Sequence, residues 1–165
     1  MRHRHGSALK APFTVLLMIT AVLLSSCGGK SVTDSQGSLP VVTGAAGSAP
    51  TISAPSGKPP TTLVTKDIIV GSGTTAVATS TMTVHYTLMA WSTGQVVESS
   101  WTSGSPATFP LANVIKGWQE GIPGMQIGGR RLLVIPPDLG YGAAGGGPIG
   151  PNETLIFVVD VVGIA

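Results

Sequence analysis

The sequence predicts an α+β fold in which a mostly antiparallel sheet curls over one short helix. The first observation behind this prediction is a run of strand-like segments, interrupted once by a helical segment at Val114–Gly121. The second is the length of that helical segment, about two turns, which is marginal in water without a surface to pack on. Because strand-like segments precede and follow it, one sheet curled over the helix is the simplest arrangement, with Trp118 between them.

The clearest strand is Thr79–Leu88, where apolar and polar side chains alternate. Such alternation places successive side chains on opposite faces of a sheet, so one face of this strand is expected to be buried. We interpret His85, on its polar face, as a solvated surface histidine. The other predicted strands are Leu63–Val70, Val96–Ser99, Ala107–Leu111, Arg130–Ile135 and Thr154–Val162. The last of these is apolar on both faces, which predicts a central position.

The helical segment has a start signal and a stop signal. Asn113 can cap its N-terminus, and Gly121 followed by Pro123 can end it. The residues that helical spacing brings near one face are Val114, Ile115, Trp118 and Ile122. A tryptophan on that face either fills the core or forms the floor of an apolar pocket, and core filling is the commoner outcome for a single tryptophan.

Residues 1–26 are predicted to be an export signal. Three Arg and Lys residues lie within the first ten positions, and a mostly apolar stretch follows over Pro12–Leu24. A positive region followed by an apolar region of this length is typical of a signal peptide and is short for a membrane-spanning helix. From Gly28 onward the chain has six Lys and Arg against seven Asp and Glu, a balance that does not indicate a nucleic-acid-binding surface.

The predicted signal ends at Leu24-Ser25-Ser26-Cys27, and Cys27 is the only cysteine in the chain. This pattern resembles the cleavage site of bacterial lipoproteins, which implies that Cys27 carries lipid such as palmitate and becomes the N-terminal residue. An unpaired cysteine is unusual in a secreted chain, which favours lipidation over an ordinary secretory signal with an incidental cysteine. An uncleaved membrane anchor is the other alternative. In either anchored form we expect a cell-envelope protein whose domain lies outside the cytoplasm.

The rest of the chain divides into a tether and one domain. Residues 27–60 combine the lipidated cysteine with a stretch rich in Gly, Ser, Thr, Ala, Val and Pro, which has hardly any charge and no aromatic residue. Such a composition buries too little apolar surface to offset its conformational entropy, so we expect a flexible tether. Residues 61–165 form the predicted domain, and their number is near the common size of a single domain.

The predicted domain lacks the side-chain sets of ordinary acid–base, nucleophilic or metal catalysis. His85 is its only histidine, and no Ser/His/Asp set can be built without it. The glycine-rich stretch Leu139–Asn152 does not lead from a strand into a helix, so it does not match a phosphate-binding loop. No residues have the spacing of metal ligands. A binding pocket is the better interpretation, and we expect no metal and no cofactor.

Several blocks of residues in the domain keep a characteristic order and spacing. They are Val84-His85-Tyr86-Thr87, Gly94 through Glu98-Ser99-Ser100, Val114-Ile115-Lys116-Gly117-Trp118 with Gly121 and Met125, Gly128 to Arg130, Pro137-Asp138, Tyr141-Gly142 and Pro151 to Phe157. This pattern resembles the FKBP-type peptidyl-prolyl cis–trans isomerases, the immunophilins that bind macrolide immunosuppressants, and it covers about Leu63–Ala165. The resemblance implies an FKBP-like antiparallel half-barrel sheet wrapped around one short helix.

The resemblance also implies the residues of the site. The catalytic pocket would be formed by Tyr86, Trp118, Tyr141 and Phe157, with Trp118 as the floor under the proline ring. The substrate-binding residues would be Val97, Glu98, Val114, Ile115 and Ile149. By the same resemblance, the Ile115 amide and the Tyr141 hydroxyl would each donate a hydrogen bond to a substrate carbonyl, and Ile149 would close the rim from the glycine-rich loop.

Three positions depart from the family's pattern. Val97 and Ala107 stand where many members have an aromatic residue, and Glu98 stands where Asp is usual. The loss of two rings is expected to open the pocket and to remove apolar contact area.

The resemblance implies a peptidyl-prolyl cis–trans isomerase, or rotamase, that accelerates rotation about X–Pro bonds in exported proteins by binding the proline in an apolar pocket. Its expected partners are proline-containing exported polypeptides, macrolide-type ligands and, through the lipid alone, a membrane. We expect a monomer that binds no nucleic acid. Because Val97 and Ala107 lack rings, the alternative is a non-catalytic chaperone or a module that binds proline-containing segments on the same fold.

Overall fold

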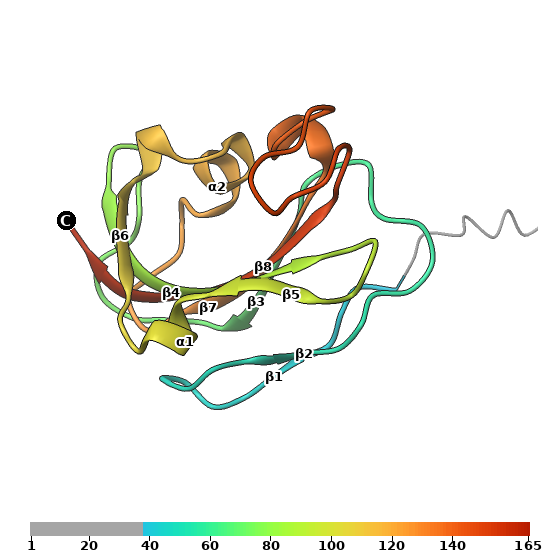
Figure 1. The fold of residues 1–165 in the computed structure, drawn as a ribbon. Coiled ribbons are helices and arrows are strands. Elements are labelled where there is room, and N and C mark those ends of the chain that lie inside the picture. The colour runs from blue at the N-terminus through green and yellow to red at the C-terminus, as the bar shows by residue number, and fades with distance from the viewer. Residues whose placement is uncertain (1–37) are drawn as a thin grey trace, which may run out of the picture. The chain divides into compact units, whose positions relative to one another are not determined.

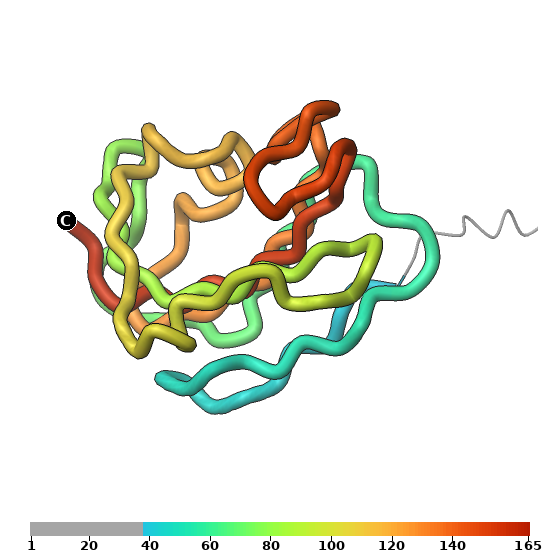
Figure 2. The backbone as a smooth tube through the Cα atoms, in the orientation of Figure 1, coloured from blue at the N-terminus to red at the C-terminus, as the bar shows by residue number. Residues whose placement is uncertain are grey.

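The computed structural model describes residues 38–165, so the predicted signal, Cys27 and residues 28–37 of the predicted tether lie outside the described part. Six strands form one antiparallel sheet (Figures 1 and 2): β3 (Val64–Ile69), β4 (Thr81–Ala90), β5 (Val96–Ser99), β6 (Ala107–Pro110), β7 (Arg130–Ile135) and β8 (Leu155–Ile164). The helical elements are α1 (Ser100–Ser103), α2 (Lys116–Gly121) and the 3₁₀ turns η1 (Leu111–Asn113) and η2 (Pro137–Leu139). Among the described residues, no helix has the length and apolar character needed to cross a membrane.

The strand order β3-β7-β8-β4-β5 confirms the predicted fold class and the central position of β8. Each predicted strand agrees with the observed one to within two residues at either end. The long strand β4 pairs with β8 along one edge, and with both β6 and β5 in succession along the other. Register shifts in the pairing of β4 with β8 and with β5 mark the points where the ladder bends. The resulting curved sheet wraps around α2 (Figure 1).

The first turn of α2 differs from the prediction. Asn113 does not cap the helix, because it ends the preceding 3₁₀ turn η1. The helix begins at Lys116 with Ile115 at its N-cap position, and no side chain caps it there. The close packing of the helix on the sheet depends on a glycine, since a Cβ atom at Gly117 would clash with the side chain of Ile135 on β7. The close approach that this glycine permits leaves Trp118 buried on the concave side of the sheet.

Residues 38–60 correct the expectation of a flexible tether. The strands β1 (Val42–Thr43) and β2 (Thr51–Ile52) pair as a small hairpin, which lies on the opposite side of the sheet from α2 (Figure 1). We call residues 38–60 the strap. Its apolar side chains Leu39, Val42 and Ile52 pack on a second apolar cluster of the sheet, formed by Met89, Trp91, Leu132, Val134, Ile156 and Val158. The prediction of a flexible tether from composition was wrong for residues 38–60, because the apolar surface that these side chains cover belongs to strands distant in the sequence.

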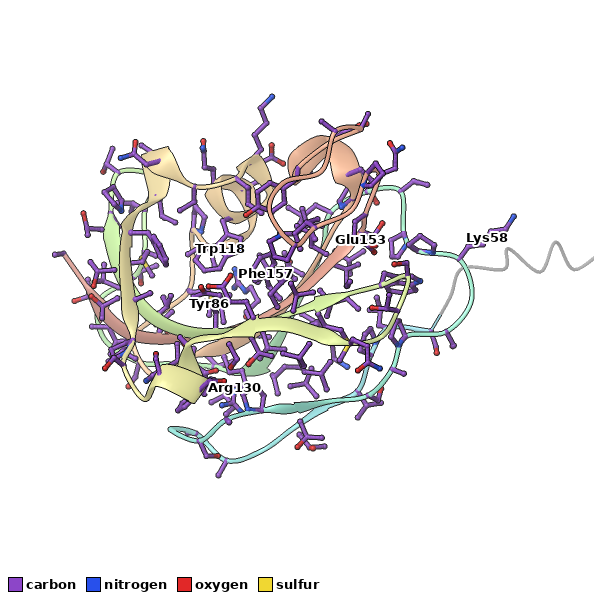
Figure 3. All side chains as sticks on the ribbon, in the orientation of Figure 1. Lys58, Tyr86, Trp118, Arg130, Glu153 and Phe157 are labelled. Atoms are coloured by element: carbon purple, nitrogen blue, oxygen red, sulfur yellow. The ribbon has the colours of Figure 1, made fainter. Side chains whose placement is uncertain are left out.

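A buried arginine attaches the strap to the sheet. Arg130 on β7 is fully buried, and its Nε donates to Asp160 Oδ1 of β8 at 2.7 Å. Its terminal nitrogens donate to the strap carbonyls of Gly44 at 3.1 Å and Ser48 at 2.6 Å (Figure 3). A buried guanidinium is tolerated only when its charge is paired and its donors are satisfied. The strap therefore provides acceptors that this arginine needs.

The interpretation of His85 as a solvated surface histidine was also wrong. The side chain is half-buried, and its ring stacks on Trp101 with centroids 3.9 Å apart and planes 15° from parallel. Its Nδ1 lies 3.0 Å from the hydroxyl of Ser100. The alternation of β4 placed His85 on the correct face, but it could not show that α1 covers part of that face.

We predict that Val42→Asp lowers the free energy of unfolding by about 2–4 kcal/mol, because it puts a charge against an apolar layer. Val41→Asp is the matched control: Val41 is its neighbour and is 65% exposed, so a change within about 0.5 kcal/mol is expected. Urea unfolding of the purified, unlipidated protein measures both variants. Equal effects of the two substitutions would contradict the packing of the strap.

Candidate functional site

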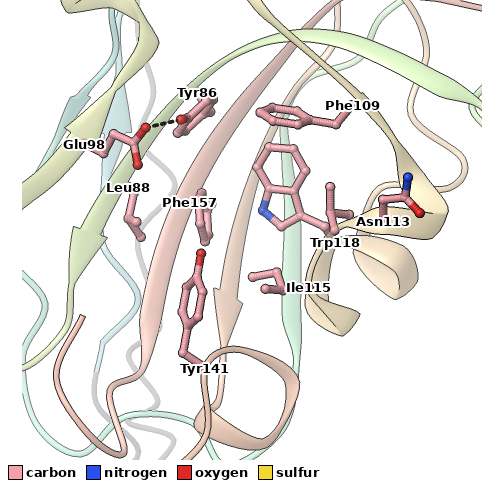
Figure 4. A pocket seen from close by; sticks show the side chains of 10 residues that line it. Tyr86, Leu88, Glu98, Phe109, Asn113, Ile115, Trp118, Tyr141 and Phe157 are labelled. Carbon is pink, nitrogen blue, oxygen red and sulfur yellow. Dashed lines mark hydrogen bonds between the residues drawn. The ribbon is translucent and has the colours of Figure 1, made fainter. Parts of the chain in front are cut away.

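A pocket of about 380 Å³ opens on the concave side of the sheet, next to α2. Figure 4 shows its lining, which consists of Tyr86, Leu88, Glu98, Phe109, Asn113, Val114, Ile115, Trp118, Tyr141 and Phe157. Seven of these residues are among the predicted site residues. The structure therefore brings together side chains that are more than 70 positions apart in the sequence, from Tyr86 to Phe157.

Trp118 stands at the centre of the aromatic lining. It is 4% exposed, and the planes of three neighbouring rings are nearly perpendicular to its own. The centroid distances from Trp118 are 5.3 Å to Phe157, 5.9 Å to Tyr86 and 6.0 Å to Phe109, with interplanar angles of 82°, 82° and 89°. Edge-to-face contacts at such distances are favourable for aromatic pairs. The rings hold one another in place and form an apolar cup.

The elements of the fold explain how these rings meet. Alternation along β4 directs Tyr86 toward the concave side, and Phe157 lies on the neighbouring central strand β8. Phe109 comes from β6, which pairs with the first part of β4. Trp118 comes from α2, so the sheet provides the walls of the cup and the helix provides its floor.

Phe109 is a pocket residue that the sequence analysis missed. It lies two positions after Ala107 on β6, and therefore on the same face of that strand. The alternation in that segment was a signal that could have identified it. Phe109 therefore contributes an aromatic ring to a pocket in which Val97 and Ala107 contribute none. Leu88 and Asn113 are the other lining residues outside the predicted set.

Two predicted substrate-binding residues do not line this pocket. Ile149 is 7% exposed and belongs to the inner apolar cluster, where its backbone pairs with Gly146. Val97 is half-buried and packs against the same cluster. Both residues share the inner apolar cluster with Trp118 and Phe157, and the rim role of Ile149 stays a prediction.

Tyr86 and Glu98 form the polar edge of the cup. The Tyr86 hydroxyl donates to Glu98 Oε1 at 2.5 Å (Figure 4). Burial raises the pKa of Tyr86 well above its usual value of 10, and the hydrogen bond and negative charge of Glu98 raise it further. The hydroxyl therefore stays protonated at physiological pH and occupies one oxygen of the carboxylate.

Two further polar groups lie at the mouth of the pocket. Tyr141 is 43% exposed, and its ring packs against Gly146 of the same loop with its hydroxyl directed over the pocket (Figure 4). Ile115 has an extended backbone, and its carbonyl accepts from the amides of Trp118 and Gln119. Its own amide N–H has no acceptor within residues 38–165. This arrangement can hold an apolar ring in the cup and donate hydrogen bonds to acceptors at its mouth.

A model of the family described as FKBP-type peptidyl-prolyl cis-trans isomerase matches residues 72–162. The chain belongs to this family. Its members are isomerases of the peptide bond before proline, and this chain is an enzyme of that class. The match begins after the strap, so the strap lies outside the part of the chain that the family model describes.

Individual relatives agree with this assignment. An FK506-binding protein of Streptomyces anulatus is 50% identical over 106 residues, which are 62% of this chain and 86% of the relative. A probable FK506-binding protein of Corynebacterium glutamicum is 47% identical over 100 residues, 61% of this chain and 85% of the relative. Among solved structures, FkpA from Escherichia coli matches with a TM-score of 0.59 and 38% identity. The match covers 62% of this chain and 47% of FkpA, so it concerns about half of that protein.

We predict that Glu98→Gln lowers the pKa of Tyr86 but leaves it above 10, because burial, the largest cause of the shift, remains. Ultraviolet titration of the chain's two tyrosines measures the change, and Glu153→Gln, which alters a carboxylate bonded to Ser92, is the control. Since the folded protein keeps the Tyr86 proton to higher pH than the unfolded chain does, its stability should decline as the pH rises above about 10. An unchanged titration in Glu98→Gln would contradict this account of the shift.

Proposed function

We propose that this isomerase accelerates X–Pro rotation in exported polypeptides, and that it does so by binding the proline ring over Trp118 inside the aromatic cup. The observation that supports the proposal most strongly is the packing of three aromatic side chains, Tyr86, Phe109 and Phe157, around Trp118 in a pocket of about 380 Å³. The pyrrolidine ring of proline is compact and apolar, and a small cup lined by aromatic rings suits such a group.

The apolar lining explains how binding becomes catalysis. Rotation about the bond must overcome a barrier of about 18–20 kcal/mol that arises from amide resonance. The planar amide is polar, and the twisted amide has lost conjugation and is less polar. A pocket that excludes water therefore disfavours the planar state relative to the twisted one, which is differential binding of the transition state.

The polar groups at the mouth give the substrate its orientation. In this proposal the Ile115 amide and the Tyr141 hydroxyl donate to carbonyls on the two sides of the proline; the Ile115 amide has no acceptor within residues 38–165, and Tyr141 is 43% exposed at the mouth of the pocket. With the flanking carbonyls held, only the bond inside the cup is free to turn. The mechanism needs no nucleophile and no proton transfer, so it uses no titratable group as an acid or base.

We further propose that lipid at Cys27 holds the enzyme at a membrane outside the cytoplasm, where exported chains fold. This rests on the signal-like N-terminus and on the position of Cys27 directly after it. Cys27 lies 11 positions before Ser38, the first residue that the structure describes, and a chain of that length spans at most about 40 Å. The clients would therefore be chains that fold close to the membrane surface.

Macrolide ligands of the kind named in the relatives from Streptomyces and Corynebacterium are proposed to compete for the same cup. A macrolide that places an apolar ring over Trp118 would exclude the proline of a peptide. The enzyme is proposed to act as a monomer, since residues of a single copy are enough to form the cup.

We predict that Trp118→Phe lowers kcat/KM for a Leu-Pro or Phe-Pro tetrapeptide about three- to tenfold, because a smaller floor loses aromatic contacts. Trp101→Phe is the matched control, since Trp101 stacks on His85 and does not line the cup. Cis–trans exchange of the peptide, followed by NMR with circular dichroism as a check on folding, measures both. Equal activity in the two variants would move the site away from Trp118.

We predict that Cys27→Ser transfers the protein from the membrane fraction to the soluble fraction of the producing bacterium, because the only thiol that could carry lipid is removed. A single acyl chain gives marginal binding, so a lipoprotein-type anchor with several chains is expected in the wild type. Fractionation followed by mass spectrometry of the N-terminal peptide checks the modification directly. An unmodified Cys27 in a membrane-bound protein would instead support an uncleaved anchor.

A further inference from the structure

The rim of the aromatic cup is a short link between two helical turns. Val114 and Ile115 lie between η1 and α2, and both have extended backbone conformations, with ψ angles of 175° and 151°. The backbone N–H groups of these two residues do not donate the regular i to i−4 hydrogen bonds of an α-helix. The single backbone bond that the Val114 amide makes, to Leu111 O, is long at 3.5 Å. The link needs another contact to hold the shape in which it lines the pocket.

The side chain of Gln119 supplies that contact. Gln119 follows Trp118 on α2 and is exposed, yet its Nε2 donates to Val114 O at 2.8 Å. The same nitrogen lies 3.5 Å from Ala112 O, on the other side of Asn113. Within residues 38–165, this amide is the hydrogen-bond partner of the Val114 carbonyl. One side chain therefore ties the rim to the helix that carries the floor of the cup.

The chemistry of this contact requires a donor. The groups that Gln119 faces are two backbone carbonyls, which can only accept hydrogen bonds. An ionised Glu has nearly the same shape as Gln but offers no N–H, and its charge would be repelled by both oxygens. The residue type at position 119 thus decides whether the rim is held or pushed outward.

We propose that Gln119 is a positioning residue for the isomerisation: by holding Val114 O, it fixes the Ile115 amide at the height above Trp118 where a substrate carbonyl can accept from it. This inference rests on the proposed function, in which the Ile115 amide binds substrate. Gln119 itself touches no substrate. Because the Ile115 amide binds the carbonyl in both the planar and the twisted state, disturbing it should weaken both equally, raising KM and leaving kcat nearly unchanged.

A series at position 119 tests the need for a donor. Gln, Glu, Ala and Lys have similar helix propensities, so α2 itself should be little affected. For Gln119→Glu we expect kcat/KM to fall roughly three- to tenfold, the range of one net hydrogen bond, with most of the change in KM. Gln119→Ala should lose about half as much on a logarithmic scale, and Gln119→Lys, which restores a donor, should recover most of the wild-type value. Peptide exchange measured by NMR over a range of peptide concentrations separates kcat from KM.

The neighbouring Glu120 provides the control. It is exposed on the same helix and makes no side-chain hydrogen bond within residues 38–165. Glu120→Ala and Glu120→Lys should therefore leave kcat and KM unchanged, which removes charge and helix propensity as explanations. Thermal unfolding of every variant completes the set, and melting temperatures close to the wild type are expected.

The possible outcomes are distinguishable. If the wild-type protein does not accelerate exchange, the proposed function fails before Gln119 is tested. If the wild type is active and Gln119→Glu matches it, the proposed function stands and the positioning role is wrong. The role is equally contradicted if Lys fails to restore activity, if the loss lies in kcat, or if activity falls only in step with the melting temperature.

Discussion

The packing of α2 on β7 is the contact on which the rest of the site depends. A helix of six residues does not persist in water alone, so the sheet must hold it. Two glycines on its buried face make this possible, since a side chain at Gly117 would clash with Ile135 and a Cβ at Gly121 would lie 2.5 Å from Leu133. Because these glycines let the helix pack closely on the sheet, Trp118 lies on the concave side of the sheet with three aromatic rings around it. The pocket therefore exists because its helix lacks side chains at two points.

The sheet that supports α2 is buried on both faces. Its concave face packs on the helix, and its other face is covered in part by the strap, which Arg130 holds through the carbonyls of Gly44 and Ser48. Because the Arg130–Asp160 pair is buried, loss of the strap's carbonyls would leave guanidinium donors without partners, at a cost of about 1–3 kcal/mol for each group. The strap and the isomerase domain are thus one folding unit, although the family model begins only after the strap.

Local patterns in the sequence were enough to predict the strands and the short helix, because alternation and spacing fix which face a side chain takes. Most residues of the aromatic cup were predicted from the resemblance to the family. Local patterns failed where a residue's surroundings come from distant segments. The residues around Val42 in the sequence have the composition of a flexible tether, and only the folded structure shows that Val42 packs on apolar side chains of distant strands. Arg130 looks like an ordinary strand residue until the carbonyls that surround it are known. Phe109 does have a local signal, since it shares a face of β6 with Ala107, a position where many members of the family have an aromatic residue.

The central claim is that proline binds in the aromatic cup and not on the outer face of the sheet. The most direct test is a titration of the ¹⁵N-labelled protein with a Leu-Pro tetrapeptide, followed by NMR. The indole N–H of Trp118 is buried and has no hydrogen-bond partner within residues 38–165, so it should report a ring placed above it. We expect the signals of the Trp118 indole and the Ile115 amide to shift, and the indole signal of Trp101 to stay unchanged. Shifts centred on Trp101 and the strap, with Trp118 unaffected, would contradict the account.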